Sequence, residues 1–100
     1  MMFSFALKRY DRMLFGVFCD TELEGLVLRS GRKKIDLSND FFQWNKRSEE
    51  ETKEIIKDCD WVLLCGNKCI KWALSEGIVE ESSINKVNGI PFSNVFFVNI

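Results

Sequence analysis

The sequence predicts an α+β fold, a mostly antiparallel sheet with two main helices. Three observations predict it. The chain has 100 residues, the length of a single domain, so we assign residues 1–100 to one domain. Hydrophobic residues make up 46% of the chain and charged residues 29%, which is typical of a globular protein. Apolar runs that suit strands come mostly in pairs, in the order ββ, ββ, α, β, α, ββ.

The first pair of predicted strands forms a hairpin. Residues 3–7 alternate apolar side chains with small or polar ones, as a half-buried strand does. A polar break at residues 10–12 separates them from the continuous apolar run 14–19. After this run, Asp20 can cap a short helical turn that stops at Gly25.

A second predicted hairpin carries the densest positive charge in the chain. Apolar residues at 26–28 and 35–37 flank the polar, glycine-containing turn 29–34. The next segment, 38–45, has no clear period. We expect it to be a loop whose aromatic side chains fold inward.

The strongest helical signal begins at Ser48. Glu51 stands three residues later, which is the spacing of a capping box. An apolar stripe with helical spacing then covers residues 52–59. The apolar run 61–65 suits a buried strand, with a continuation of the helix as the alternative, and helical spacing returns over residues 67–74.

The last predicted elements are the end of this second helix and a hairpin over residues 84–98. Gly77 suits the C-cap of the helix. Asn88 and Gly89 are the residue pair most typical of a two-residue hairpin turn. Pro91 has no N–H to donate to a ladder, so we expect it at a sheet edge or in the loop.

The order of these features resembles the small archaeal proteins grouped as domain of unknown function 424. The resemblance spans nearly the whole chain and includes the acidic helix capped at Ser48. The matching motif positions are Cys19, Asp20, Gly25, Gly66, Asn67, Gly77, Gly89 and Pro91. In the family a histidine tends to follow that proline, where this sequence has Phe92, so a site dependent on the imidazole does not carry over. The resemblance implies an archaeal cytoplasmic protein and brings no established activity.

The composition excludes several classes of function. The chain has no histidine, which excludes Ser–His–Asp and Cys–His catalysis and histidine-ligated metals. Its net charge is -1, whereas the simplest nucleic-acid-binding signature is a strongly basic domain. No apolar run is long enough to span a membrane, and the N-terminus lacks the pattern of a signal peptide. We therefore expect a cytoplasmic protein with no membrane partner.

The cysteines predict no metal site and no cofactor. They are Cys19, Cys59, Cys65 and Cys69. Their irregular spacing differs from the paired C-x-x-C motifs of zinc sites, so we expect free, buried thiols. The alternatives are four thiolates that converge on zinc through the fold, and a reactive thiol beside a cation.

The candidate binding surface is the basic turn together with residues that follow it. Its members are Arg29, Arg32, Lys33, Lys34, Trp44, Lys46 and Arg47. Clustered cations can bind phosphates, and an aromatic ring can stack on an exposed base. The charge is polarised, with +3 over residues 1–47 and -4 over residues 48–100, which suits docking by one face. The alternatives are a solvated turn that only aids solubility, and a protein partner with an acidic patch.

A second candidate site is the start of the second helix. Backbone N–H groups at Gly66 and Asn67 could bind an anion, although a tight strand-to-helix turn explains the same glycine. The spacing of the carboxylates forces no pair for acid–base catalysis. The large aromatic residues of the second half are interpreted as core and not as a stacking platform: Trp61, Trp72, Phe96 and Phe97.

These observations together predict a non-catalytic binding or interaction module in translation or RNA metabolism. Its expected partner is RNA, a ribonucleoprotein or another protein. The alternative is a small-ligand-binding protein or an enzyme that uses the Gly66–Asn67 helix start and nearby carboxylates. A deep polar cleft favours the alternative, and a flat basic face favours the binding module.

Overall fold

The computed structural model describes residues 1–98 and has the predicted α+β fold. Its strands are β1 (Met2–Tyr10), β2 (Met13–Asp20), β3 (Val27–Ser30), β4 (Lys33–Asp36), β5 (Asn45–Ser48), β6 (Trp61–Cys65), β7 (Asn85–Val87) and β8 (Ile90–Phe96). Its helices are α1 (Glu49–Lys57), α2 (Asn67–Ser75) and the short 3-10 turns η1 (Thr21–Leu23) and η2 (Glu81–Ser83). No helix within residues 1–98 has the length and apolar character needed to cross a membrane.

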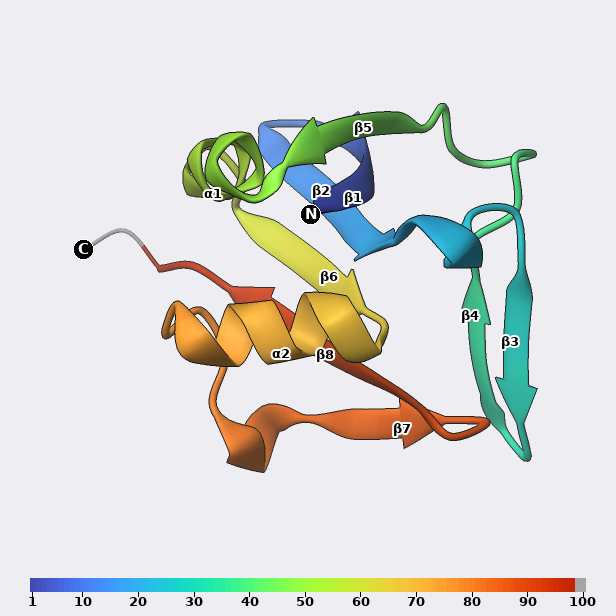
Figure 1. Cartoon of the computed structure of the whole chain (residues 1–100). Helices are drawn as coiled ribbons and strands as arrows, with labels where there is room; N and C mark the ends of the chain where they lie inside the picture. Colours follow the sequence, from blue (N-terminus) through green and yellow to red (C-terminus); the bar gives the residue numbers. More distant parts are fainter. Residues whose placement is uncertain (99–100) are drawn as a thin grey trace.

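Six strands form one sheet in the order β5-β1-β2-β6-β8-β7, while β3 and β4 form a separate hairpin (Figure 1). Neighbours in the sheet are antiparallel except β2 and β6, whose parallel register pairs Phe15 with Trp61. A parallel pair needs a crossover connection, which here contains the β3–β4 hairpin, β5 and α1. The prediction of a mostly antiparallel sheet is confirmed.

Different elements pack on the two faces of the sheet. Helices α1 and α2 pack on one face, the helix face, over buried side chains such as Phe18 and Leu64. The other face, the hairpin face, is covered by η1, the β3–β4 hairpin and the loop before β5, around Val17 and Cys65. Because side chains alternate along a strand, neighbours such as Val17 and Phe18 belong to opposite cores.

Both α-helices follow the sequence signals. Ser48 is the N-cap of α1, and its Oγ accepts a hydrogen bond from the Glu51 N–H at 3.3 Å. The apolar stripe buries Thr52 and Ile56, and the glutamates of the first turn lie at the positive end of the helix dipole. Gly77 follows the end of α2 with φ of 72°, the left-handed conformation expected of a C-terminal glycine.

The prediction of an inward-folded loop over residues 38–45 is wrong in two respects. Phe41 is 55% exposed, and Asn45 is already the first residue of strand β5. This edge strand consists of polar residues, so it has no hydrophobic alternation for a sequence pattern to detect. Its conformation is set by pairing with β1, which places Met2 opposite Ser48.

Pro91 lies inside the sheet and not at its edge. It belongs to β8, between β6 and β7, and stands opposite Lys86. The carbonyl of Pro91 accepts a hydrogen bond from the Gly66 N–H at 2.9 Å. The nitrogen of Pro91 therefore also faces β6 and not β7. Strand β6 has already ended there at Cys65, so the ladder requires no N–H from the proline.

Candidate nucleic-acid interface

The predicted basic turn is exposed. Its four cations lie at the surface: Arg29, Arg32, Lys33 and Lys34. Leu28 and Ile35 are buried beneath the hairpin. Arg29 and Lys34, which stand opposite each other in the register, therefore point to the outer side.

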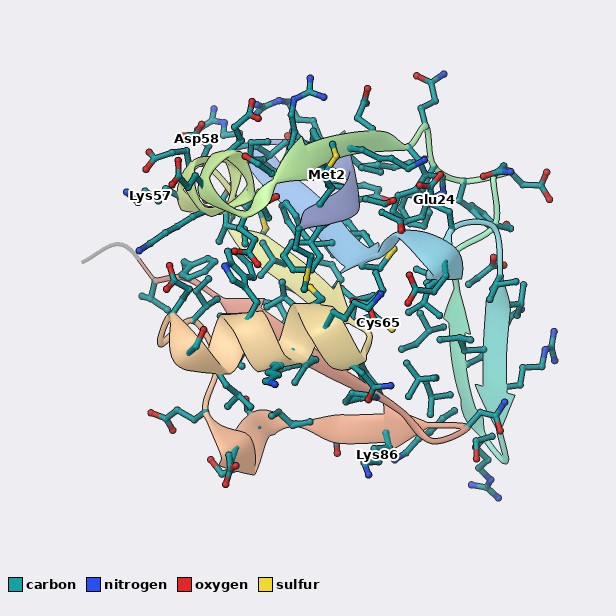
Figure 2. The ribbon with its side chains drawn as sticks, viewed as in Figure 1. Met2, Glu24, Lys57, Asp58, Cys65 and Lys86 are labelled. Carbon is teal, nitrogen blue, oxygen red and sulfur yellow. The ribbon has the colours of Figure 1, made fainter. Side chains whose placement is uncertain are left out.

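Lys33 lies on the inner side of the hairpin and joins it to the sheet. Its Nζ donates a hydrogen bond to the Lys86 carbonyl of β7 at 3.2 Å. Figure 1 accordingly shows the turn of the hairpin beside the end of β7, and Figure 2 shows Lys86 on that strand. The basic turn is thus placed at the β7 edge of the molecule.

The structure does not bring the other three predicted residues to this turn. Lys46 and Arg47 lie in β5, and Trp44 directly precedes it, at the sheet edge opposite β7. In the sheet, β1, β2, β6 and β8 lie between β5 and the β7 edge that the basic turn contacts. Trp44 is half-buried against Phe42, with ring centres 5.4 Å apart.

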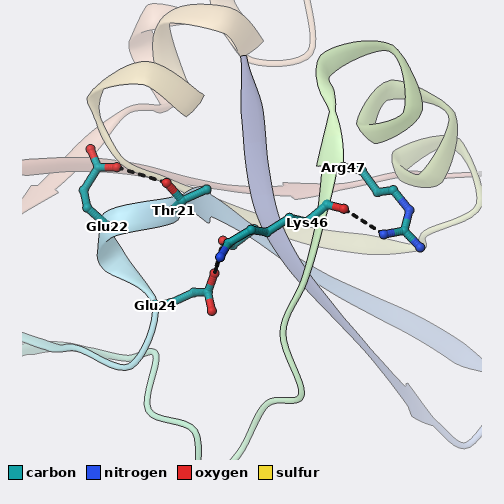
Figure 3. A network of polar contacts seen from close by, with 6 residues as sticks. Thr21, Glu22, Glu24, Lys46 and Arg47 are labelled. Carbon is teal, nitrogen blue, oxygen red and sulfur yellow. Dashed lines mark hydrogen bonds and ion pairs between the residues drawn. The ribbon is translucent and has the colours of Figure 1, made fainter.

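The two cations of β5 also have acidic partners. Lys46 pairs with Glu24 (Figure 3), its Nζ 3.7 Å from the carboxylate, and the Ser4 hydroxyl donates to the same carboxylate. The Nε of Arg47 lies 3.8 Å from the Glu51 carboxylate. These residues support the β1–β5 edge and do not extend the basic turn.

Four aromatic side chains form a row across the hairpin face, one from each of four neighbouring strands. The aromatic row consists of Tyr10 (β1), Phe15 (β2), Trp61 (β6) and Phe96 (β8). Successive ring centres lie 6.4, 4.1 and 5.2 Å apart, and the rings of Trp61 and Phe96 are stacked at 11°. Phe96 is 62% exposed and Tyr10 56% exposed, so the row ends in open ring surface.

Sequence reasoning missed this row, because the interpretation of Trp61 and Phe96 as core is only partly right. Trp72 is 8% exposed and belongs to the helix-face core, whereas Phe96 and Phe97 are exposed. The row depends on the register that pairs Trp61 with both Phe15 and Phe96. No local pattern in the sequence specifies which strands become neighbours.

A pocket of about 370 Å³ opens beside the row, between β4 and the sheet; we call it the hairpin pocket. It is lined by Lys33–Asp36 of the hairpin and by Phe15, Trp61, Leu63, Phe92 and Asn94 of the sheet. An aromatic ring, Phe92, thus stands where the resemblance led us to consider an imidazole. Asn94 is exposed, and its Oδ1 accepts a hydrogen bond from the Trp61 indole N–H at 3.2 Å.

Positive charge borders the aromatic row on two sides. Lys8 stands opposite Phe15 in the β1–β2 register, and its Nζ lies 5.6 Å from the centre of the Phe42 ring, a cation–π contact. On the other side, Lys33 and Lys34 line the hairpin pocket. Ring surface and cations therefore occur together, although the rings are those of the aromatic row and not, as the sequence predicts, that of Trp44.

The start of α2, the second candidate site, is already occupied by a carboxylate of the chain. Asp20 accepts hydrogen bonds from the backbone N–H groups of Lys68 and Cys69 at 3.1 and 2.7 Å. Gly66 has φ of 113°, and a Cβ there would lie 2.4 Å from the Asp20 Cγ. Asp20 caps this distant helix and not η1, where it makes no side-chain cap. The Gly66 N–H donates to the Pro91 carbonyl, so three of the backbone donors at this helix start are in use, and Asp20 takes the place of an anion.

The remaining motif positions have structural roles in the backbone. Gly25, Gly77 and Gly89 all have positive φ, and Asn67 is the first residue of α2. Asn88 also has positive φ, at 49°, so it forms with Gly89 the predicted hairpin turn.

The four cysteines are free and buried, and they are divided between the two cores. Cys19 and Cys65 lie in the hairpin-face core, whereas Cys59 and Cys69 lie in the helix-face core. Burial raises the pKa of Cys59 to about 11 and, with the charge of Asp20, that of Cys65 to about 12. Burial also raises the pKa of Cys19 and Cys69. Residues 1–98 contain no cluster of acidic and cysteine side chains placed to hold a metal ion.

Comparison with known proteins gives a family and a fold. The model of a family described as "Protein of unknown function (DUF424)" matches residues 9–98. A crystal structure of an uncharacterized conserved protein from Methanopyrus kandleri has a TM-score of 0.74 at 13% identity, covering 96% of this chain and 91% of that one. At this identity the likeness concerns the fold alone. None of the curated proteins matches the sequence.

Proposed function

Because the chain belongs to DUF424, a family of unknown function, we propose a function from its own geometry: non-catalytic binding of single-stranded RNA, in translation or RNA metabolism. The observation that supports this is the aromatic row beside the hairpin pocket. Bases would stack on the row, and the bordering lysines would contact phosphates.

Stacking supplies the first part of the physical reason. A base that stacks on an aromatic side chain gains about 1–3 kcal/mol, and sheets of RNA-binding domains use exposed rings for this purpose. Phe96 and Tyr10 expose 62% and 56% of their surface. Two large apolar rings exposed at the ends of one continuous row are a surface suited to ligand binding.

Charge supplies the second part. Phosphate contacts by lysine and arginine provide most of the sequence-independent affinity for nucleic acids. The net charge of -1 hides the polarity of the chain, because residues 1–47 carry +3. Lys8 and Lys33 belong to this basic half and border the row, and Lys34 lies next to Lys33 on the outer side of β4.

Single-stranded RNA is favoured over a duplex by the position of the rings. Phe15 is 8% exposed and Trp61 is packed between it and Phe96, so the open ring surface is that of Tyr10 and Phe96 at the ends of the row. Only a base that has left its own stack can lie against such rings, and unpaired loops and ends provide these bases.

Substitution of Phe96 tests the proposal. We expect Phe96→Ala to weaken binding of a fluorescently labelled single-stranded oligoribonucleotide about 10-fold at low salt, measured by anisotropy. The ring is 62% exposed, so the fold should be retained. Phe41→Ala is the matched control, since Phe41 is 55% exposed but lies outside the row, and it should bind as the wild type does.

Two results would contradict RNA binding through the row. One is equal affinity of the two alanine variants. The other is an absence of binding by the wild-type protein at low salt. In the second case, capture of a partner protein that persists after nuclease treatment would identify a protein-binding module instead.

A further inference from the structure

The hairpin pocket contains a hydrogen-bond donor in a fixed orientation. The Oδ1 of Asn94 accepts from the Trp61 indole N–H at 3.2 Å. This bond fixes the orientation of the side-chain amide, because only its oxygen can accept. The NH₂ group of Asn94 is therefore left to donate to a ligand in the pocket that this residue lines.

The charged residues that line the pocket belong to β4, where successive side chains alternate between the inner and the outer side of the hairpin. Ile35 is buried beneath the hairpin, so Lys34 and Asp36 belong to the opposite, outer side. The Asp36 Oδ1 accepts instead from the Ser38 N–H of its own loop at 2.9 Å. Lys33 lies on the inner side, where its Nζ donates to the Lys86 carbonyl. The side chains that face the pocket thus offer donors to a ligand.

We propose that the hairpin pocket binds a single unstacked base, uracil or guanine, whose O4 or O6 atom accepts from the Asn94 amide. This inference rests on the proposed RNA binding and adds a preference to it. The rings of Phe92 and Trp61 line the pocket next to the donor and give the base apolar contact. The volume of about 370 Å³ leaves room for one base.

The chemistry separates keto from amino bases. Uracil presents O4 as an acceptor at the position where cytosine presents an N4 amino donor, and guanine O6 differs in the same way from the adenine N6 amino group. A donor on the protein binds the first of each pair and opposes the second. Leaving such a polar group unpaired lowers affinity on the order of 10-fold.

Oligouridylate and oligocytidylate of equal length are the matched probes, since both are single-stranded pyrimidines. We expect the wild type to bind oligouridylate about 10-fold more tightly. In Asn94→Ala, which removes the donor without adding charge, the ratio of the two affinities should fall to about 1. Asn45→Ala, on β5 at the far edge of the sheet, is the control and should keep the wild-type ratio.

Asn94→Asp provides a second variant in which the contact with Trp61 is kept. Its carboxylate still accepts from the indole N–H but has no amide donor, so the preference for oligouridylate should again be lost. Equal binding of both oligonucleotides by the wild type, or an unchanged ratio in the Asn94 variants, would overturn the base preference and leave RNA binding intact. Binding of neither probe at low salt would overturn both.

Discussion

The helix face and the hairpin face of the central sheet are built from the same strands, yet they are closed to different extents. On the helix face, the buried Asp20 carboxylate accepts from two backbone donors at the start of α2. On the hairpin face, the core around Val17 and Cys65 is sealed. The same face then continues into exposed rings at Tyr10 and Phe96.

This difference indicates which parts of the chain serve stability and which serve binding. Burial of apolar surface stabilises a fold by about 25 cal/mol per Å², so a ring that remains exposed contributes little of that energy. Phe96 stacks on Trp61 and is still 62% exposed. A ligand that stacks on it would supply the missing cover. The hairpin face is therefore where we expect substitutions to change binding more than stability.

The largest loss of stability is expected at Gly66. Its φ of 113° disfavours any side chain, and a Cβ would lie 2.4 Å from the Asp20 carboxylate carbon. Gly66→Ala adds backbone strain and displaces a carboxylate that caps α2, so the free energy of unfolding should fall by about 4 kcal/mol. Chemical denaturation measures this value.

Gly31→Ala is the matched control for that substitution. Gly31 also has positive φ, at 59°, but no atom lies within 4 Å of a Cβ built there. It should lose only about 1–2 kcal/mol, the cost of left-handed backbone. Equal losses at the two glycines would show that the carboxylate cap does not contribute, and that the helix face is less constrained than its geometry indicates.

The pH dependence of stability tests whether the core of the hairpin face, around Cys65, excludes water. Burial raises the pKa of the Cys65 thiol from 9.0 to about 12, so the folded state keeps a proton that the unfolded chain releases. The stabilisation is complete below about pH 9 and is lost as the pH rises towards 12. Between these values the unfolding free energy should fall by about 1.4 kcal/mol per pH unit from this group.

Urea denaturation over this pH range measures the slope. Cys65→Ala should be less stable at pH 7 because of the cavity it leaves, yet its stability should decline less steeply above pH 9 than that of the wild type. If the slope is unchanged in the variant, Cys65 is hydrated and the hairpin does not exclude water from this core.

Local signals were sufficient to predict the elements that local interactions specify. The Ser48 cap involves a residue three positions away, and the Asn88–Gly89 turn is complete within its own hairpin. Strand β5 was missed because a polar edge strand takes its conformation from the strand beside it. Asp20 was assigned to its own helical turn, but it binds Lys68 and Cys69 across the fold.

The candidate site was predictable only in part, for the same reason. The cations of the β3–β4 turn are consecutive or nearly so in sequence, and the structure keeps them together. Trp44, Lys46 and Arg47 are close to them in sequence, but the chain crosses to the opposite sheet edge before it reaches β5. The aromatic row requires the order of four strands, which short-range patterns do not contain.

The smallest effect on stability is expected at the basic turn, where the effect on binding is the most diagnostic. Reversing Arg32 and Lys34 to glutamate changes exposed residues and keeps the Lys33 hydrogen bond to β7, so the unfolding free energy should move by about 0.5 kcal/mol or less. If both contact phosphates, binding should weaken, and the slope of log affinity against log salt should fall by about 0.7 per lost contact. Titration of RNA at several salt concentrations gives this slope.

Phosphate contacts position a nucleic acid without reading its bases, so this double variant should lose affinity for oligouridylate and oligocytidylate alike. The control is the same charge reversal at Lys57 and Lys71, which lie in the helices on the other side of the sheet. A pair of glutamates there should leave the slope unchanged, because exposed charges beyond about 10 Å are screened at moderate salt. If both double variants weaken binding equally, attraction depends only on net charge and the hairpin face has no special part in it. If only the hairpin variant does so, the RNA lies along the face that the fold leaves open.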